Sequence, residues 1–594
     1  MVKISALLLV CLITAGCALD ESSDADVRTF LRTYNEIDRN LSRVAAEAAW
    51  AAATDLTPEN TNRRIGAESA LAAFRGSPFV IETSQRFLES RASLTDLEFR
   101  QLDKILLLAA EYPGTVPDLA ARRVAAEAMA DASLQGFPYC EERRGNTCAA
   151  ALTPDEIEAV LFQSRDLPRR RRVWEAAKQV GVVVKPRLAE IRNLQNRAAR
   201  ELGYSSYLHL QVSDYGMDVA DLMKLMEETA ARMRPLYEQV FQYAAGRLSE
   251  RYRQSRPREL PAHWLPHPLG QAWPGVVETI HDEALFQGKS AEWVVRQAAQ
   301  FYESLGFDRL PESFWVKSDL YRTPATSARL KSNGARSWHI DRGRDVRSSM
   351  SAAPDMRWFL TSHRELGRVH YFLACSREEL PPVLREGLNR AFHVAIGNLG
   401  AMAARRESYL RQIGLPTAGR AAAPMDVLLA EALEGPIVFL PWAAGVVSHF
   451  EYELYEKELP PGRFNTRWWE LVRRYQNIVP PSPRGEQFCD ACTTAHIVEE
   501  PARYYDLVLA QLIQYQLHDY ISRKILRQDP REASYYDRPD VGDWLLDIME
   551  LGATRDWREV LKEKTGEDLS VRALLEYFQP LAEHLKELEG ARDQ

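Results

Sequence analysis

Apolar residues recur at three- and four-residue spacing along most of the 594-residue chain. Two clear examples are residues 27–54, VRTFLRTYNEIDRNLSRVAAEAAWAAAT, and residues 69–89, SALAAFRGSPFVIETSQRFLE. This spacing places apolar side chains on one helix face, and Pro and Gly cluster between such segments. Good strand candidates occur only between about residues 314 and 347. The pattern predicts a mostly α fold, with one large helical body and a minor β element.

The N-terminus has the pattern of an export signal. A basic residue precedes an apolar run over residues 4–13, which is shorter than the roughly 18 to 20 residues that cross a bilayer. The following TAGC ends at Cys17 and resembles a bacterial lipoprotein cleavage site. We expect a signal peptide over 1–16, a lipid on Cys17, and a linker over 17–26. Ala18 favours the outer membrane of a bacterial envelope. Cleavage without lipid attachment is the alternative.

Composition and charge narrow the possible functions. Hydrophobic residues make up 46% of the chain and charged residues 27%, as in a globular protein. The net charge of −8 argues against nucleic-acid binding. The arginine run at 169–172 is therefore expected to form a solvated helix face. No repeat or low-complexity block divides the chain, although its length alone would allow several domains.

The stretch TSHRELGRVHYF, residues 361–372, has the frame in which zinc peptidases carry H-E-x-x-H. In that motif, two histidines one turn apart bind zinc, and the glutamate activates the metal-bound water. Arg364 and Arg368 stand in the histidine positions, and Glu365 keeps the position of the base. In HVAIGN, Val394 stands where a third ligand would be needed. Neither guanidinium nor valine offers a lone pair to a metal, so we expect zinc binding to be lost.

Segments around this frame resemble the angiotensin-converting-enzyme family of zinc peptidyl-dipeptidases, a gluzincin family, from about Asp26 onward. They are GRVHYF, LPPVLREGLNRAFHVAIGN, ELGYSSY, FNTRWWELVRRYQNIVPPSPRG and FCDACTTAHI. The resemblance implies a single peptidase-like domain over 27–594. It also implies two helical halves around a deep central cleft, with the helices of about 27–110 forming a lid.

Five cysteines lie beyond the export signal. Cys140 and Cys148 flank the polar turn EERRGNT, where the family has a disulfide, and export favours disulfide formation. Cys489 and Cys492 form a C-x-x-C motif, which is compatible with a redox pair, a metal half-site or a local disulfide; we favour the structural disulfide. Cys375 is left over and is expected to be buried.

The resemblance places several residues along a peptide groove. Ala335 and Trp338 match the family's edge strand, while Gly334 replaces a histidine that contacts substrate. An extended peptide could still pair with the backbone of that strand. Gln271 matches a glutamine that helps to hold the substrate's C-terminal carboxylate, but Thr494 replaces the partnering lysine. Loss of this charge-assisted hydrogen bond, commonly about 1.5 to 3 kcal/mol, weakens recognition of C-terminal dipeptides.

Other matched positions concern catalysis and anion binding. His496 in TAHI matches the family's transition-state histidine, and Tyr504 or Tyr505 matches its tyrosine; a packing role is the alternative for each. Without a metal-bound water, these groups have no transition state to stabilise. In WWELVRR, Val472 replaces an arginine that the family uses for chloride, so anion activation is doubtful.

A relocated zinc site is not expected. Asn398, one turn after Val394, replaces an aspartate of the family, a carboxylate that would orient metal-bound histidines. His363, His370 and His393 lie nearby in sequence. However, His363 and His370 are two turns apart, about 10 Å along a helix, whereas zinc ligands bind at about 2 Å.

These replacements predict a catalytically defective peptidase homologue on the cell envelope that binds a peptide or protein partner in or over its cleft. Arg364 and Arg368 with Glu365 leave one unmatched positive charge, which should attract a peptide carboxylate or an acidic side chain of the fold. The alternatives are an active or residual peptidyl-dipeptidase, for which Glu365, His496 and the tyrosine pair argue, and a structural scaffold. The sequence predicts no oligomeric state.

Overall fold

The computed structural model describes residues 24–592, except residues 146, 278–284, 325, 328, 333 and 418–423. The predicted signal peptide and the predicted lipid site at Cys17 lie outside the described residues. Within them, helices dominate and strands are few and short, which confirms the mostly α class predicted from the hydrophobic pattern.

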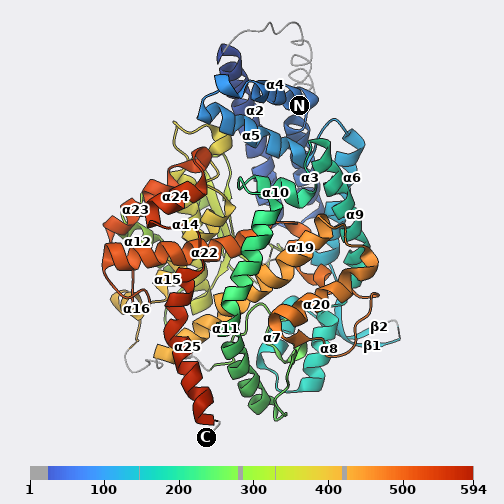
Figure 1. Ribbon diagram of the computed structural model, residues 1–594, viewed down its shortest axis with the longest axis vertical. Helices are drawn as coiled ribbons and strands as arrows, with labels where there is room; N and C mark the ends of the chain where they lie inside the picture. Colours follow the sequence, from blue (N-terminus) through green and yellow to red (C-terminus); the bar gives the residue numbers. More distant parts are fainter. Residues whose placement is uncertain are drawn as a thin grey trace.

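Four helices cover the upper part of the molecule in Figure 1: α2 (Asp24–Thr54), α3 (Pro58–Arg75), α4 (Pro78–Glu89) and α5 (Asp96–Glu111). The segment predicted as one helix over 69–89 is divided between α3 and α4. Gly76 ends α3, the Ser77 side chain accepts a hydrogen bond from the Val80 N–H, and Pro78 begins α4. Proline suits the first turn because its missing N–H has no partner there in any case.

These helices form a separate small core. Its buried members include Val27, Leu31, Tyr34, Leu102 and Ile105, and the cluster also contains Val383 and Leu384 of the body. The lid implied by the family resemblance is therefore a packing unit of its own.

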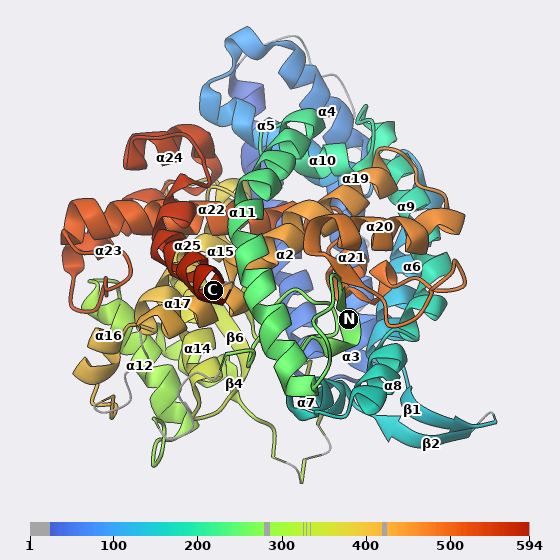
Figure 2. The same ribbon diagram turned by 60° about the horizontal axis from the view of Figure 1, so that its bottom comes forward.

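The body begins with a mostly helical half and a hairpin. Its elements are α6 (Pro117–Gln135), β1 (Tyr139–Arg144), β2 (Thr147–Leu152), α7 (Pro154–Gln163), α8 (Leu167–Ala177), α9 (Val180–Glu201), α10 (Tyr207–Ser213), α11 (Val219–Tyr252) and β3 (Leu260–Pro261). The long helix α11 runs through the middle of the molecule, with α6, α8 and α9 to one side of it in both ribbon views (Figures 1 and 2).

The rest of the body completes both halves. Its elements are α12 (Ala291–Ser304), α13 (Glu312–Lys317), β4 (Asp319–Tyr321), β5 (Arg336–His339), β6 (Val346–Ala352), α14 (Met356–Ala374), α15 (Arg390–Ala404), α16 (Glu407–Gln412), α17 (Pro424–Glu434), α18 (Pro436–Leu440), α19 (Ser448–Tyr455), α20 (Phe464–Gln476), β7 (Ile478–Val479), α21 (Ala495–Glu499), α22 (Tyr505–Tyr520), α23 (Pro539–Met549), α24 (Trp557–Thr565) and α25 (Arg572–Arg592). Helices α12, α14, α15, α22 and α23 lie on the opposite side of α11 from α9 and α20 (Figure 1).

The strand prediction near 314–347 is confirmed by a three-stranded sheet in the order β4-β6-β5. Strand β5 is antiparallel to β6, with Trp338 opposite Arg347, and its other edge is not paired within that sheet. The hairpin β1–β2, which projects from the body in Figure 2, was not predicted, because EERR in β1 is polar throughout. The Cys140–Cys148 disulfide joins its two strands, as the resemblance implied.

The expectation for the arginine run is wrong at one position. Arg169, Arg171 and Arg172 are exposed, but Arg170 is buried. Its guanidinium donates to backbone carbonyls that include those of His263 at 2.8 Å and Leu265 at 2.9 Å. Four adjacent residues cover all sides of a helix, so one of them had to face the core.

One helical stretch, Pro424–Tyr455, is long and apolar enough to cross a membrane by length and composition. In the fold, 78% of its most apolar window is buried. It therefore packs as a core helix of the body, continued through a π-helical turn at Pro441–Val447.

Candidate functional site

Helix α14 carries the residues that match the H-E-x-x-H motif, α15 carries the position matched to the third ligand, and the two helices pack closely together. The side chain of Asp355 begins α14 by accepting a hydrogen bond from the Trp358 N–H at 2.8 Å. A Cβ atom on Gly397 of α15 would lie 2.6 Å from the carbonyl oxygen of Arg364, and one on Gly367 would lie 2.9 Å from the Cα of Gly397. Glycine at these positions brings the two backbones into contact beside the frame.

Glu365 is fully buried between α14 and β5. Ser337 Oγ donates to its Oε2 at 3.0 Å, while Arg364 Nε and Arg368 Nη1 lie 3.4 and 3.5 Å from its Oε1. The i, i+3 spacing along α14 brings Arg368 to Glu365, as the sequence predicted, and the adjacent Arg364 reaches the same oxygen. Burial lowers the pKa of the Arg364 guanidinium, and the Glu365 charge opposes this shift.

The residues at the zinc positions do not fit a zinc ion. Arginine stays protonated and has no lone pair for a metal, and Val394, partly buried on α15, has no donor atom. Among the described residues, no three His, Cys, Asp or Glu side chains are grouped so that they could hold a metal ion.

Two of the three nearby histidines hydrogen-bond to backbone carbonyls, and the third, His370, packs against Tyr302 with ring centroids 4.8 Å apart. His363 Nδ1 donates to the Phe359 carbonyl at 2.7 Å, and His393 Nε2 donates to the Glu386 carbonyl at 2.6 Å. Burial lowers the pKa of His363 to about 4 and that of His370 and His393 to about 3. They are neutral packing residues at pH 7.

A second group lies around His496. The ring of Tyr504 packs edge-on against His496 with centroids 4.8 Å apart, and its hydroxyl donates to Gln271 Oε1 at 3.0 Å. Trp442 Nε1 donates to the same hydroxyl at 3.0 Å. Burial lowers the pKa of His496 and raises that of Tyr504. The fold thus brings Gln271 to Tyr504 and His496, which are close together in the sequence but far from Gln271.

Tyr505 does not belong to this group. Its hydroxyl lies 3.4 Å from Arg390 Nη2, and its ring packs against Tyr215 with centroids 5.5 Å apart. Of the two tyrosines that the sequence left open, Tyr504 is the one beside His496.

The edge strand β5 presents its residues to two different neighbours. Ser337 faces Glu365, whereas Trp338 packs edge-on against Trp50 of the lid helix α2, with centroids 5.0 Å apart. Side chains alternate across a strand, so this division follows from the pleat. Ala335, just before β5, is partly buried. Ser337 was missed from the sequence, where only this alternation could have indicated it.

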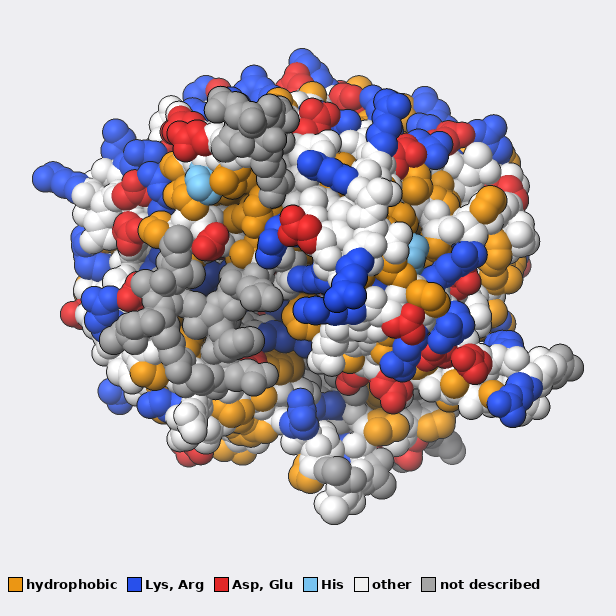
Figure 3. Space-filling view, turned by 90° about the horizontal axis from the view of Figure 1, so that it is seen from below, with side chains coloured by type: hydrophobic (Ala, Val, Ile, Leu, Met, Phe, Trp, Pro, Cys, Tyr) orange, Lys and Arg blue, Asp and Glu red, His pale blue; other side chains and the backbone are white. Residues whose placement is uncertain are grey.

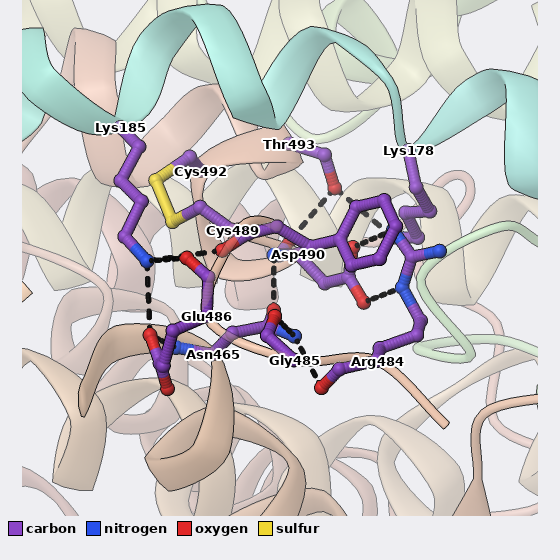
Figure 4. The surroundings of a disulfide bond; sticks show 11 residues. Lys178, Lys185, Asn465, Arg484, Gly485, Glu486, Cys489, Asp490, Cys492 and Thr493 are labelled. Carbon is purple, nitrogen blue, oxygen red and sulfur yellow. Dashed lines mark hydrogen bonds and ion pairs between the residues drawn. A yellow bond between two sulfur atoms is a disulfide. The ribbon is translucent and has the colours of Figure 1, made fainter. Parts of the chain in front are cut away.

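Figure 4 shows the loop that leads to His496, with the Cys489–Cys492 disulfide that we favoured from the sequence. Asp490, between the cysteines, accepts hydrogen bonds from Arg484 Nε at 2.6 Å and Nη2 at 2.7 Å. Lys178 Nζ donates to Thr493 Oγ1 at 3.0 Å, and burial lowers the lysine pKa to about 8. The remaining cysteine, Cys375, is buried and free, as expected.

Thr494 and Val472, which the resemblance matches to the family's carboxylate-binding lysine and chloride-binding arginine, both lie in this region. Thr494 is buried, and its Oγ1 has no hydrogen-bond partner in the described part of the chain. Val472 lines a small recess together with Lys178 and Trp469. Trp469 Nε1 donates to Asp490 Oδ2 at 2.8 Å, so a carboxylate of the chain itself lies beside these groups.

A family model described as peptidase M2, angiotensin-converting enzyme, matches residues 21–594. The chain belongs to this family. It is similar to the angiotensin-converting enzyme of Mus musculus, with 28% identity over 588 residues that cover 95% of this chain and 43% of the mouse protein. It is also similar to the angiotensin-converting enzyme of Theromyzon tessulatum, with 25% identity over 600 residues that cover 94% of this chain and 92% of that protein.

The chain therefore spans less than half the length of the mouse angiotensin-converting enzyme and most of the length of the Theromyzon protein. Membership in the angiotensin-converting-enzyme family identifies the chain as a homologue of peptidases and agrees with the helical fold. At Arg364, Arg368 and Val394, the positions that the sequence matches to the zinc ligands of the motif, α14 and α15 carry no donor atom for a metal.

Proposed function

We propose that this chain is a catalytically defective member of the angiotensin-converting-enzyme family that binds a peptide or protein partner in or over its cleft. One observation carries the proposal: arginines stand at both histidine positions of the frame and share the carboxylate of Glu365. The carboxylate that would activate a water is held by two cations and Ser337 instead.

Purified protein is expected to carry far less than one equivalent of zinc and to release no dipeptides from peptide C-termini. The physical reason is that the frame lacks donor atoms at all three ligand positions. Elemental analysis beside a peptidyl-dipeptidase assay tests both expectations. One equivalent of chelator-removable zinc, with activity that disappears on chelation, would contradict the proposal.

A variant with ligand residues restored at all three positions provides the matched control. The triple variant Arg364→His, Arg368→His and Val394→Glu restores two imidazoles and a carboxylate beside the retained Glu365. It is expected to bind about one zinc ion per chain under the conditions in which the natural protein binds none. This result would show that the assay detects zinc in this fold.

A residual peptidyl-dipeptidase is the second candidate function, because Tyr504 still contacts both Gln271 and His496. A structural scaffold is the third. Binding of peptides to the inactive natural protein separates the binder from the scaffold. Turnover that survives the change of Glu365 to Gln would argue against both a defective enzyme and a role for this carboxylate.

We also propose that the protein is anchored to a bacterial envelope, in the outer membrane, through a lipid on Cys17. The support is the sequence pattern of residues 1–18 alone. The full-length precursor is expected to partition with membranes, and Cys17→Ser is expected to release the protein as a soluble form. Natural protein that is fully soluble in the periplasm or the medium would rule out the anchor.

A further inference from the structure

A cavity of about 860 Å³ opens beside Arg364. Its lining comes from α14, α15, α17, α22 and α25, and includes Thr361, Asn398 and Tyr515. Neither Glu365 nor Arg368 lines it, and among the described residues the group of Gln271, His496 and Tyr504 does not line it either. We call this cavity the Arg364 recess.

The α14 wall of the Arg364 recess carries positive charge that has little compensation. Arg357 and Arg364 lie two turns apart on the same helix face and both line the recess. Arg364 is 40% exposed and reaches Glu365 only at 3.4 Å, and Arg368 competes for the same oxygen at 3.5 Å. Within the described part of the chain, no carboxylate lies within ion-pair distance of Arg357, whose guanidinium is 6.0 Å from the Trp358 ring.

Most acidic groups around the recess are already paired with arginines. The pairs are Glu431 with Arg406 at 3.3 Å, Glu434 with Arg405 at 3.9 Å, and Glu407 with Arg411 at 2.5 Å. Among the acids of the described lining, Glu532 alone has no ion pair. Arg357 and the weakly paired Arg364 therefore leave unmatched positive charge on α14, and Glu532 leaves one unmatched negative charge elsewhere in the described lining. On the lower face as a whole, basic and acidic side chains are mixed, with several basic ones near its middle (Figure 3).

The other walls of the recess are largely apolar. They include Met356, Leu360, Met402, Met425 and Leu428. Methionine side chains are flexible and polarizable, so such a wall can accept apolar groups of different shapes. The volume falls in the range of pockets that enclose small ligands, about 300 to 1,000 Å³. The recess therefore has room for the end of a chain and not for a folded partner.

We propose that the Arg364 recess binds the C-terminal carboxylate and the last apolar side chain of a peptide, with Arg364 as the anchor. The proposal rests on the peptide-binding function proposed above. A guanidinium can hold a carboxylate through two parallel hydrogen bonds. An apolar side chain would bury its surface against Met356, Met402 and Met425 of the lining. Carboxylate recognition would thus be displaced from Gln271, whose cationic partner is replaced by Thr494, to α14.

The test uses one hexapeptide that ends in leucine, prepared with a free C-terminal carboxylate and with a C-terminal amide. The natural protein is expected to bind the acid about 10- to 100-fold more tightly than the amide, as follows from losing charge-assisted hydrogen bonds of about 1.5 to 3 kcal/mol. Arg364→Gln is expected to abolish this preference, and Arg364→Lys to retain part of it. Isothermal titration calorimetry measures each affinity, and thermal unfolding confirms that each variant is folded.

Arg368→Gln is the matched control, because it removes the same charge from the same helix and from the same shared carboxylate but lies outside the recess lining. It is expected to keep the preference for the acid. Equal binding of acid and amide, or a preference that survives Arg364→Gln, would overturn the assignment of the recess and leave peptide binding itself intact. Failure of both peptides to bind would contradict peptide binding as well. Octanoate that binds more tightly than the peptide acid would overturn the peptide assignment in favour of a lipid carboxylate.

Discussion

Glu451→Gln is expected to remove a large loss of stability at alkaline pH. Glu451 is fully buried on α19, and its carboxylate accepts hydrogen bonds from the N–H groups of Ala502 at 2.9 Å and Tyr504 at 3.2 Å. Burial raises the pKa of this carboxyl to about 8, and the two N–H groups only partly oppose the shift. Among the described residues, no Lys or Arg forms an ion pair with Glu451 that would compensate the charge when the proton leaves.

The direction of the pH dependence follows from this raised pKa. The folded protein holds the proton more tightly than the unfolded chain, in which a glutamate has its ordinary pKa of 4.5. The stabilising contribution is complete below that value and is lost as the pH rises through about 8. The full loss is on the order of 5 kcal/mol, at 1.36 kcal/mol for each unit of pKa difference.

Denaturant unfolding of the natural protein and of Glu451→Gln between pH 5 and pH 9 measures this effect. As the pH rises, the free energy of unfolding of the natural protein should fall relative to that of Glu451→Gln, because the amide cannot ionise. Glu228→Gln, at an exposed position, should follow the natural protein throughout. A constant offset between Glu451→Gln and the natural protein would contradict the prediction.

The part of the site that lies on one helix was predictable from the sequence. Arg368 follows Glu365 by three residues, so the contact of its guanidinium with that carboxylate requires only that the segment is helical. The break at Pro78 also had a local signal, a proline after Gly-Ser, although the apolar spacing of residues 69–89 alone predicted one continuous helix. Local geometry fixes both features without knowledge of the rest of the fold.

Features that depend on distant packing could not be predicted in this way. The contact of Ser337 with Glu365 needs the register of β5 against α14, and the choice of Tyr504 beside His496 needs the course of the loop before α22. Trp338 was matched to a substrate groove, but the structure packs it against Trp50 of the lid. Arg170 was predicted to be exposed because it lies in a run of four arginines, and such a run does not indicate which side of α8 faces the core.

Asp490→Asn is expected to lower the free energy of unfolding by about 3 to 5 kcal/mol, the usual cost of breaking a buried ion pair. Asp490 is fully buried, and its Arg484 partner has a side chain that is only 4% exposed. Figure 4 shows the pair beside the Cys489–Cys492 loop, and Trp469 Nε1 also donates to the carboxylate. An amide keeps the shape but leaves the guanidinium as an uncompensated buried charge.

Chemical denaturation at pH 7 measures the loss, and Asp96→Asn supplies the comparison. Asp96 pairs with Arg91 at 2.6 Å, but both side chains are exposed, so its loss should cost less than about 1 kcal/mol. The double variant Asp490→Leu with Arg484→Met should recover much of the stability lost in Asp490→Asn, because no charge then remains buried at the pair. A loss in Asp490→Asn no larger than that in Asp96→Asn would show that Arg484 finds water or another acceptor in the folded state. The loop that leads to His496 would then be held by the Cys489–Cys492 disulfide and by Lys178 and Lys185 instead.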